Sequence, residues 1–298
     1  MTSPRQYQVF GTEVRAEPIL AGLYIAATPI GNLGDVTLRA LETLAAADLL
    51  ACEDTRVTSR LTQHYGISTP LIAYHEHNAE RQRPRLLATI AKGKAVALVS
   101  DAGTPLVSDP GYRLVVDVVA AGHPVVPIPG ASAMLAGLVG AGLPTDRFMF
   151  AGFLPPRTTA RKKKLADLAG LSTTLIFYEA PRRVAATLAD MAATMGGERP
   201  CAVARELTKM FETFRRGTLD ELSEAFSDEG PPKGEVTIII GPPPAPAPNE
   251  GDVDSMLRSR MKQASLADAV AEVTAATGAA RKLVYRRALE LSAIDDPS

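Results

Sequence analysis

Three glycine-containing stretches each follow a short apolar run, and their residue types point to ligand binding. Residues 27–35 read "ATPIGNLGD", residues 99–111 read "VSDAGTPLVSDPG" and residues 127–133 read "PIPGASA". Glycine lets a backbone approach a ligand closely, and α/β sheets bind ligands at the loops that follow their parallel strands. Because three such loops should converge on one edge of a sheet, the sequence predicts a small-molecule site there.

The composition of these loops restricts the ligand. They match neither GxGxxG nor a P-loop, they contain no lysine, and Arg39 is a distant arginine. A phosphate-rich ligand would lack a side-chain counter-charge there, although backbone N–H groups could still serve. A neutral or cationic ligand fits better, with Asp101 as the nearest carboxylate.

Other catalytic patterns in the chain are incomplete. "GASAM" ends in Met where a nucleophile elbow requires Gly, so Ser132 is interpreted as a backbone-level binder or a helix cap. His75 and His77 are spaced as on one face of a strand, but no third ligand lies at useful spacing, so no metal is predicted. The stretch "ACEDTR" at residues 51–56 is either an ion-paired helix start or part of a substrate wall.

An alternating pattern supplies the elements that must position the loops. Apolar runs bounded by Gly, Pro or Asp predict buried parallel strands at residues 23–28, 95–100 and 123–129. Helical periods lie at residues 37–48, 55–66, 79–93 and 109–122. In the last of these, Asp109 is the expected N-cap and Pro110 the first helical residue. The pattern predicts an α/β lobe with a mostly parallel sheet.

The following segment is richer in strands. Strands are expected at residues 173–180, 200–206, 210–218 and 234–241, around helices at residues 158–169 and 181–194. Two of these strands are close enough in sequence to pair as a hairpin, which favours a mixed sheet.

The whole chain therefore divides into five parts. They are a flexible leader (1–20), an N-terminal α/β lobe (21–146), a C-terminal α/β lobe (147–241), a Pro-rich linker (242–252) and a helical extension (253–298). The extension has a helix, a Gly turn and a second helix, which is typical of a helix-turn-helix but also of helical hairpins that bind no nucleic acid.

Whole-chain properties exclude little beyond membrane insertion. The longest apolar run, residues 131–143, is shorter than the roughly 20 residues of a membrane-spanning helix, and the N-terminus lacks the apolar stretch of a signal peptide. Cys52 and Cys201 match no metal or disulfide spacing and are expected to be buried, which fits a reducing compartment. We expect a cytoplasmic protein.

Basic residues gather locally although the formal net charge is −1. The clusters lie at residues 81–85, 157–164, 182–183 and 281–287. Such a run is either a solvated face or a surface for RNA or another phosphate backbone. The charge pattern alone leaves both interpretations open.

Taken together, seven motifs resemble one family. In chain order they read "TPIGNLGD", "CEDTR", "VSDAGTPLVSDPG", "PIPGASA", "GFLPPR", "FYEAPRR" and "GEVTIIIG". Their order and approximate spacing resemble the bacterial ribosomal RNA small subunit methyltransferase I enzymes, within the tetrapyrrole (corrin/porphyrin) methylase superfamily. The resemblance covers about residues 20–241, and the tail resembles the family's helical extension.

This resemblance implies a two-lobed, homodimeric α/β enzyme that holds S-adenosylmethionine folded between its lobes. Carried over by matching motif, the cofactor-binding residues would be Ile30, Gly31, Asp101, Gly103, Thr104, Val107, Ser132, Ala133, Phe177, Gly234 and Glu235. Gly103-Thr104-Pro105 stands where the corrin branch commonly has Gly-Asp-Pro, which favours an RNA substrate over a tetrapyrrole.

The implied reaction is 2′-O-methylation of a cytidine in 16S ribosomal RNA of the small subunit. Candidates for the general base are His77, Asp101 and Glu179, which lie in or beside the motifs of the cleft. The expected RNA-binding residues are Arg56, Arg157, Arg161, Lys162, Lys163, Lys164, Arg182 and Arg183. The alternatives are a methyltransferase acting on a tetrapyrrole or another small molecule, and a metabolite-sensing regulator that binds nucleic acid.

Overall fold

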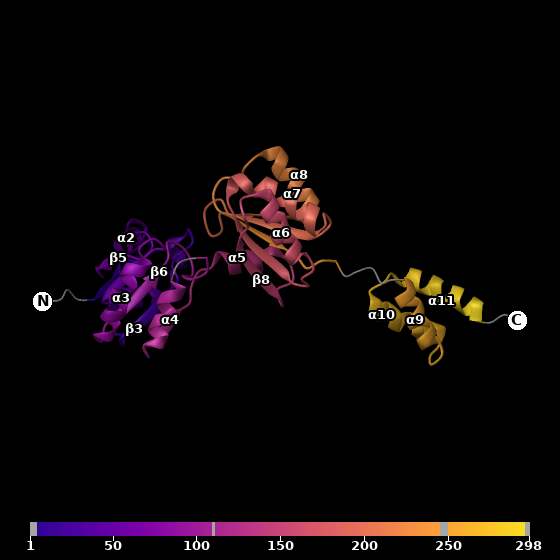
Figure 1. Cartoon of the computed structure of the whole chain (residues 1–298), viewed down its shortest axis with the longest axis horizontal. Helices are drawn as coiled ribbons and strands as arrows, with labels where there is room; N and C mark the ends of the chain where they lie inside the picture. The colour runs from indigo at the N-terminus through magenta and orange to yellow at the C-terminus, as the bar shows by residue number, and fades with distance from the viewer. Residues whose placement is uncertain (1–4, 109–110, 245–249, 296–298) are drawn as a thin grey trace. The chain divides into compact units, whose positions relative to one another are not determined.

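The computed structural model describes residues 5–108, 111–244 and 250–295, which form two units, Met1–Pro243 and Pro244–Ser298 (Figure 1). The described residues of the first unit form two five-stranded sheets, a two-stranded sheet and the helices that cover them, and those of the second unit form helices. No helix in the described ranges is long and apolar enough to cross a membrane.

A parallel sheet of five strands forms the first lobe, with the strand order β5-β4-β6-β3-β7. The strands are β3 (Gly22–Ala26), β4 (Leu49–Cys52), β5 (Leu71–Ala73), β6 (Ala95–Val99) and β7 (Val125–Ile128). Every residue of β3 and β6 is buried, as expected for parallel strands covered on both faces. The predictions of β3, β6 and β7 are confirmed, whereas β4 and β5 were too short to stand out in the sequence.

Helices cover this sheet. They are α1 (Leu38–Ala46), α2 (Thr55–His64), α3 (Ala79–Ala91) and α4 (Tyr112–Ala120), with a short 3₁₀ turn η1 (Leu33–Asp35) before α1. The Ala40 amide donates to Thr37 Oγ1 and so caps α1. Helix α4 starts later than predicted, because Gly111, at φ +136°, holds its cap position. The predicted cap residues Asp109 and Pro110 lie outside the described residues.

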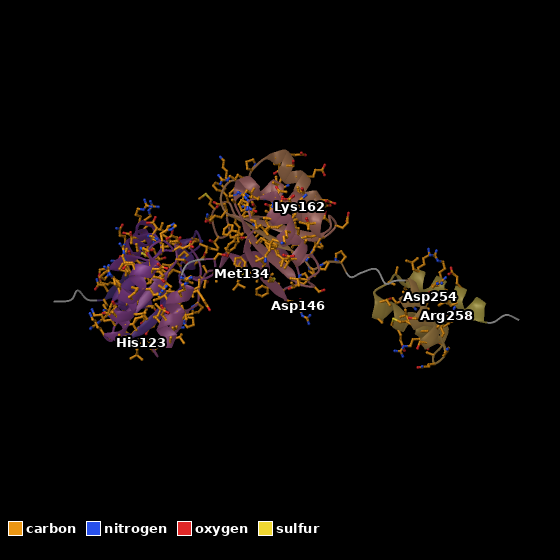
Figure 2. All side chains as sticks on the ribbon, in the orientation of Figure 1. His123, Met134, Asp146, Lys162, Asp254 and Arg258 are labelled. Carbon is orange, nitrogen blue, oxygen red and sulfur yellow. The ribbon has the colours of Figure 1, made fainter. Side chains whose placement is uncertain are left out.

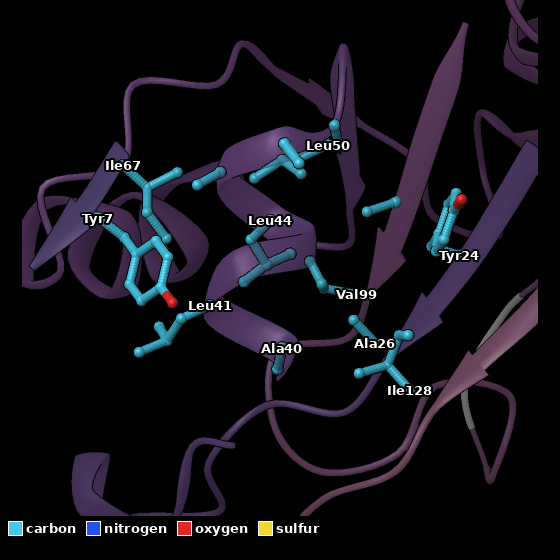
Figure 3. Close-up of a cluster of buried hydrophobic side chains, with 14 of the residues drawn as sticks. Tyr7, Tyr24, Ala26, Ala40, Leu41, Leu44, Leu50, Ile67, Val99 and Ile128 are labelled. Atoms are coloured by element: carbon cyan, nitrogen blue, oxygen red, sulfur yellow. The ribbon is translucent and has the colours of Figure 1, made fainter. Parts of the chain in front are cut away.

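The N-terminal segment corrects one prediction. Strands β1 (Gln6–Val9) and β2 (Thr12–Arg15) form an antiparallel hairpin instead of a flexible leader. Tyr7 is 7% exposed and packs in the same core cluster as Leu41 and Leu44 of α1 (Figure 3). Burial of this aromatic ring holds the hairpin on the lobe.

The second lobe has a mixed sheet, as predicted, with the order β11-β10-β12-β9-β8. Its strands are β8 (Phe148–Phe153), β9 (Thr174–Glu179), β10 (Pro200–Arg205), β11 (Thr213–Thr218) and β12 (Val236–Ile240). Strand β8 pairs in parallel with β9, and the other pairs are antiparallel, including the predicted β10–β11 hairpin. Cys201 in β10 and Cys52 in β4 are both buried, as expected, and burial raises the pKa of each thiol.

Three helices described in the second lobe pack on one face of this sheet: α6 (Thr158–Ala169), α7 (Val184–Met195) and α8 (Leu219–Glu229). A 3₁₀ turn, η2 (Pro181–Arg183), precedes α7. Helix α8 was not predicted, although Thr218 and Glu221 form a capping box at its start, which is a recognisable sequence signal.

Helix α5 (Ala133–Ala141) packs against the second sheet, although the sequence assigned it to the first lobe. At Gly137 an added Cβ would lie 3.1 Å from Thr237 Cγ2 of β12, so the helix backbone approaches the strand closely. Leu138 belongs to the same buried cluster as Ile239. The loop before α5 is thereby placed where the two lobes meet.

The second unit has its own core. Its described residues form α9 (Glu250–Met261), α10 (Leu266–Thr277) and α11 (Arg281–Asp295) around Leu257, Val273 and Leu291. The predicted helix, Gly turn and helix are confirmed, with Gly278 in the left-handed region at φ +67°. Helix α9 was not predicted, and its first turn occupies the end of the predicted linker.

Candidate active site

A cavity of about 330 Å³ lies where the three glycine-containing loops meet the second sheet. Its first-lobe wall contains the predicted residues Ile30, Gly103, Thr104, Val107, Ser132 and Ala133. The loops after β3, β6 and β7 therefore converge as the sequence predicted. We call this space the first cavity.

Backbone and side-chain hydrogen bonds join the three loops to one another. Thr28 and Gly103 exchange N–H···O bonds of 2.9 and 3.0 Å, and Thr104 Oγ1 donates to the Ala131 carbonyl at 3.2 Å. The middle loop takes positive φ values at Gly103 (+80°), Leu106 (+74°) and Ser108 (+64°). Positive φ is uncommon for Leu and Ser, so this loop carries backbone strain beside the cavity.

The second-lobe wall differs in two places from the expectation. Phe177 is fully buried in the core beneath the helices, because adjacent side chains of a strand point to opposite faces, and Tyr178 lines the first cavity instead. Gly234 does not line it either. At φ +87° this glycine leaves room for Glu206, whose Oε1 would lie 2.1 Å from an added Cβ.

Glu179, a candidate general base, lines the first cavity but its carboxylate is occupied. Oε1 accepts from the Ala180 amide at 2.7 Å and lies 3.2 Å from Arg183 Nε, and Oε2 accepts from Thr187 Oγ1 at 2.7 Å. The residue is 3% exposed. This arrangement fixes the end of β9 to the start of α7.

A second cavity of about 580 Å³ adjoins the first and shares Ile30, Ala102 and Glu235 with it. Two residues predicted for the cofactor, Gly31 and Asp101, line this second cavity and not the first. Asp101 Oδ1 accepts from the Asp54 amide at 2.9 Å, which ties the loop after β6 to the start of α2.

The sequence did not point to two cations of the second cavity, Arg60 of α2 and Lys209 of the β10–β11 connection. Lys209 Nζ donates to Glu206 Oε1 at 2.7 Å and to Glu235 Oε2 at 2.9 Å. The first pair closes a turn in which the Lys209 amide donates to the Glu206 carbonyl at 3.0 Å. The second joins residues 26 positions apart and has no local signal.

His77 lines neither cavity. Strand β5 ends at Ala73, so the half-buried His75 and the exposed His77 lie in the connection to α3 rather than on one face of a strand, and their ring centroids are 6.0 Å apart. The strand placement of this pair was wrong. No cluster of three metal-ligating side chains occurs within residues 5–108, 111–244 and 250–295.

Two arginines predicted to contact RNA are turned into the second lobe. Arg161 is 4% exposed and its Nη2 lies 2.5 Å from Asp190 Oδ2. Arg183 faces Glu179 and donates from Nη2 to the Leu154 carbonyl at 2.8 Å. Both predictions are corrected, since these guanidinium groups are held by protein partners.

The other predicted RNA contacts are exposed, namely Arg56, Arg157, Lys162, Lys163, Lys164 and Arg182. Lys162 on α6 is labelled in Figure 2. Arg56 forms an exposed ion pair with Asp54 at 2.6 Å. The hydrogen bonds and charge of Arg56 lower the pKa of Asp54 to about 2.

The comparisons with known proteins identify the family. Residues 22–223 match the Tetrapyrrole (Corrin/Porphyrin) Methylases, and residues 247–292 match the RsmI C-terminal HTH domain. The ribosomal RNA small subunit methyltransferase I of Mesorhizobium japonicum is 51% identical over 94% of this chain and 95% of its own length. The chain belongs to the ribosomal RNA small subunit methyltransferase I family. The predicted family, fold and S-adenosylmethionine-dependent methyltransferase class are thereby confirmed.

Other members and a solved structure agree with this assignment. The ribosomal RNA small subunit methyltransferase I of Synechocystis sp. is 47% identical over 91% of this chain and 98% of its own length. Uroporphyrin-III C-methyl transferase from Thermus thermophilus, complexed with S-adenyl homocysteine, has the same fold, with a TM-score of 0.51 and 20% identity. That alignment covers 74% of this chain and 97% of the other.

Proposed function

We propose that this enzyme transfers a methyl group from S-adenosylmethionine to the 2′-oxygen of a cytidine in 16S ribosomal RNA of the small subunit. The observation that carries the proposal is the first cavity, which three strand-end loops and the second sheet enclose within a chain of this methyltransferase family. Its volume lies within the range of small-molecule sites.

The first cavity suits a ligand with both apolar and polar parts. Ile30, Val107 and Leu207 supply apolar surface, and Thr104, Ser132 and Thr237 supply hydroxyl groups. Glu235 brings a carboxylate to the wall that the two cavities share. When bound, S-adenosylmethionine supplies a methyl group on a positively charged sulfur.

In the transfer the methyl carbon would bond to the ribose 2′-oxygen, and the electron pair of the S–CH₃ bond would remain on sulfur. The main task of the protein is alignment of these atoms, which can supply roughly 7–11 kcal/mol of barrier reduction. The hydrogen bonds around Gly103 tie together the three loops of the first-lobe wall, which would support that alignment.

Among the three candidate bases, the geometry supports Asp101 best as acceptor of the 2′-hydroxyl proton. It lines the second cavity beside the shared wall, and its Oδ2 makes no hydrogen bond to the described residues. Glu179 is proposed as a structural residue because both of its oxygens are engaged. His77 lines neither cavity, so we assign it no role in the chemistry.

For RNA binding we propose the exposed cations of α6, Lys162, Lys163 and Lys164, together with Arg56, Arg157 and Arg182. The match of the helical unit to an HTH domain supports a further contact with nucleic acid. Binding that neutralises phosphates weakens as salt rises. We propose that the enzyme works in the cytoplasm, and a substrate in the small ribosomal subunit supports this.

We also propose a homodimer formed through α4. Tyr112, Val116 and Val119 follow one face of this helix and are 74%, 44% and 61% exposed. A two-fold contact buries such a stripe on both copies at once. Sedimentation equilibrium should give a dimer for the natural protein and a monomer for Val119→Asp. A dimer of unchanged affinity in the variant would exclude this face.

Label mapping tests the reaction itself. Small subunits from a strain that lacks the modification are incubated with the enzyme and methyl-labelled S-adenosylmethionine, and the label is located by nuclease digestion and mass spectrometry. We expect label on a cytidine ribose and little transfer by Asp101→Asn. Label on a base or on protein, or label that reaches only a tetrapyrrole added to a parallel incubation, would contradict the proposal. A protein that binds RNA but never transfers methyl would favour a regulator.

A further inference from the structure

The second cavity has the position that an acceptor needs. A group transfer brings two ligands together, so their sites must meet at a common boundary. The second cavity adjoins the proposed cofactor cavity through Ile30, Ala102 and Glu235, and its volume of about 580 Å³ is within the range of small-molecule sites. Asp101, the proposed proton acceptor, also lines it.

Lys209 is held so that one of its donors remains available. An ammonium group has three N–H donors, and Glu206 and Glu235 accept two of them at 2.7 and 2.9 Å. Partial burial lowers the pKa of Lys209, but its hydrogen bonds to these two carboxylates outweigh that effect and raise the pKa. The group is therefore a charged donor and not a base.

The side chain of Lys209 also crosses from the second lobe to the first. Its Cγ and Cε lie so close to Gly31 that an added Cβ would be 2.5 Å from each. Gly31 itself has φ +145°. The absence of a side chain at position 31 thus allows the lysine to reach over the loop after β3, where its ammonium group borders the second cavity.

Arg60 supplies a second cation from a different element. It belongs to α2, lines the second cavity and is exposed, and no salt bridge to a described residue holds it. A free guanidinium at a cavity rim is suited to bidentate contact with a phosphate. A nucleotide offers a phosphate and ribose oxygens to the two cations, and a 2′-hydroxyl group to the carboxylate of Asp101.

We propose that the second cavity binds the target nucleotide, with Arg60 on its phosphate and the third N–H of Lys209 on an oxygen of its ribose. The proposal rests on the RNA methylation proposed above and names the residues that hold the acceptor. Lys209 and Arg60 are then substrate-binding residues, and Lys209 keeps the acceptor oxygen next to the shared wall.

The first experiment compares Lys209→Gln with Lys209→Arg and with the matched control Lys233→Gln, an exposed lysine that lines neither cavity. Losing a charge-assisted hydrogen bond should lower kcat/KM for small subunits about 10- to 100-fold in Lys209→Gln. Lys209→Arg should recover much of that loss, and Lys233→Gln should equal the natural enzyme. Calorimetry should give the same affinity for S-adenosylhomocysteine in Lys209→Arg, Lys233→Gln and the natural enzyme. In Lys209→Gln, where Glu235 of the first cavity loses its partner, the loss of this affinity should be much smaller than the loss of transfer.

A parallel pair tests the phosphate contact. Arg60→Gln should raise KM for the subunit several-fold and reduce the slope of log affinity against log salt by about 0.7–0.9. Arg15→Gln, an exposed arginine on β2, should leave both quantities unchanged. Wild-type transfer by both Lys209→Gln and Arg60→Gln would overturn the proposal. Equal loss of cofactor affinity and transfer in Lys209→Gln would assign the lysine to the cofactor site instead.

Nucleotide binding gives a readout that does not depend on activity. Cytidine 5′-monophosphate titrated into enzyme loaded with S-adenosylhomocysteine should shift the amide resonances of Gly31 and Thr58, which line the second cavity. The shifts should be lost in the Lys209→Gln, Arg60→Gln double variant and kept in Lys233→Gln. Absence of these shifts in the natural enzyme would overturn the proposal. If they appear but no methyl reaches RNA, the proposed function fails while the nucleotide pocket stands.

Discussion

The two walls of the first cavity are built by different means. The first-lobe wall consists of loops with small residues, held by backbone bonds such as the Thr28–Gly103 exchange. The second-lobe wall carries charged side chains held in place by partners, as in Glu179 with Arg183 and Glu235 with Lys209. Shape at this site therefore comes mainly from one lobe and charge from the other.

This difference predicts opposite sensitivities. On the first-lobe wall, added side-chain atoms should weaken ligand binding, because the backbone there lies close to the ligand. On the second-lobe wall, removal of one member of an ion pair should be the harmful change, because the remaining charged group then loses its counter-charge. Paired substitutions can separate these two modes.

The largest effect is expected at Glu179. Glu179→Ala removes the carboxylate that Arg183 and Thr187 share inside the second lobe, and should lower the free energy of unfolding by about 3 kcal/mol. Urea denaturation measures this loss. The methyl transfer rate of the folded fraction should change much less. A variant of normal stability and no activity would instead make Glu179 a catalytic base.

The control for that variant is Glu229→Ala. Glu229 is paired with Arg215 at 2.6 Å, but its side chain is 60% exposed. Exposed pairs contribute little, so the unfolding free energy should change by no more than about 0.5 kcal/mol. A loss of unfolding free energy as large as that of Glu179→Ala would show that the ion pair in the cavity wall is no more stabilising than an exposed surface pair.

An intermediate effect is expected at Gly103. Gly103 and Gly93 have nearly equal φ values, +80° and +78°, so alanine at either position introduces about 1–2 kcal/mol of backbone strain. At Gly103 the new Cβ lies 3.3 Å from Ile30 Cγ2 in the cavity wall, whereas at Gly93 it meets nothing within 4 Å. Calorimetry should show weaker S-adenosylhomocysteine binding in Gly103→Ala only, by about tenfold, equivalent to about 1.4 kcal/mol.

Gly93→Ala is thus the control for backbone strain without a new contact. Its melting temperature should fall by about as much as that of Gly103→Ala, while its ligand affinity should be unchanged. If both variants bind the ligand as the natural enzyme does, the first-lobe wall tolerates added atoms and the contrast with the second lobe is wrong.

The smallest effect concerns an exposed ion pair of the first lobe. Arg56 lowers the pKa of Asp54 to about 2, below the usual value of a carboxyl group. The stabilisation from this pair is therefore present above about pH 4. It is lost as pH falls through 2. Stability curves of the natural protein and Arg56→Gln should differ slightly near neutral pH and converge below pH 2, and a constant difference at every pH would contradict the assigned cause.

The sequence allowed the first-lobe wall to be predicted in detail, because its signals are local. Gly103, Ser132 and their neighbours follow apolar runs directly, and parallel strands bring such loops to one edge of a sheet. The second-lobe charges depend on pairing between distant residues, as in Lys209 with Glu235. No local sequence pattern predicts a pair between residues so far apart in the chain.

The errors have similar causes. Arg161 sits in a run of cations, and only the fold shows that it turns inward to Asp190 while Lys162 to Lys164 stay exposed. The prediction named Phe177, but its neighbour Tyr178 lines the first cavity. A shift of one position along a strand moves a side chain to the other face of the sheet. The β1–β2 hairpin did leave a signal, an alternating pattern around Gly11, which the interpretation as a leader overlooked.

The central claim is that the cofactor lies between a backbone wall and a charged wall. A crystal structure of the enzyme with S-adenosylhomocysteine tests it most directly. We predict the ligand in the first cavity, in contact with Gly103 and Thr104 of one lobe and with Tyr178 and Glu235 of the other. A ligand bound in the second cavity, or against one lobe alone, would contradict the account.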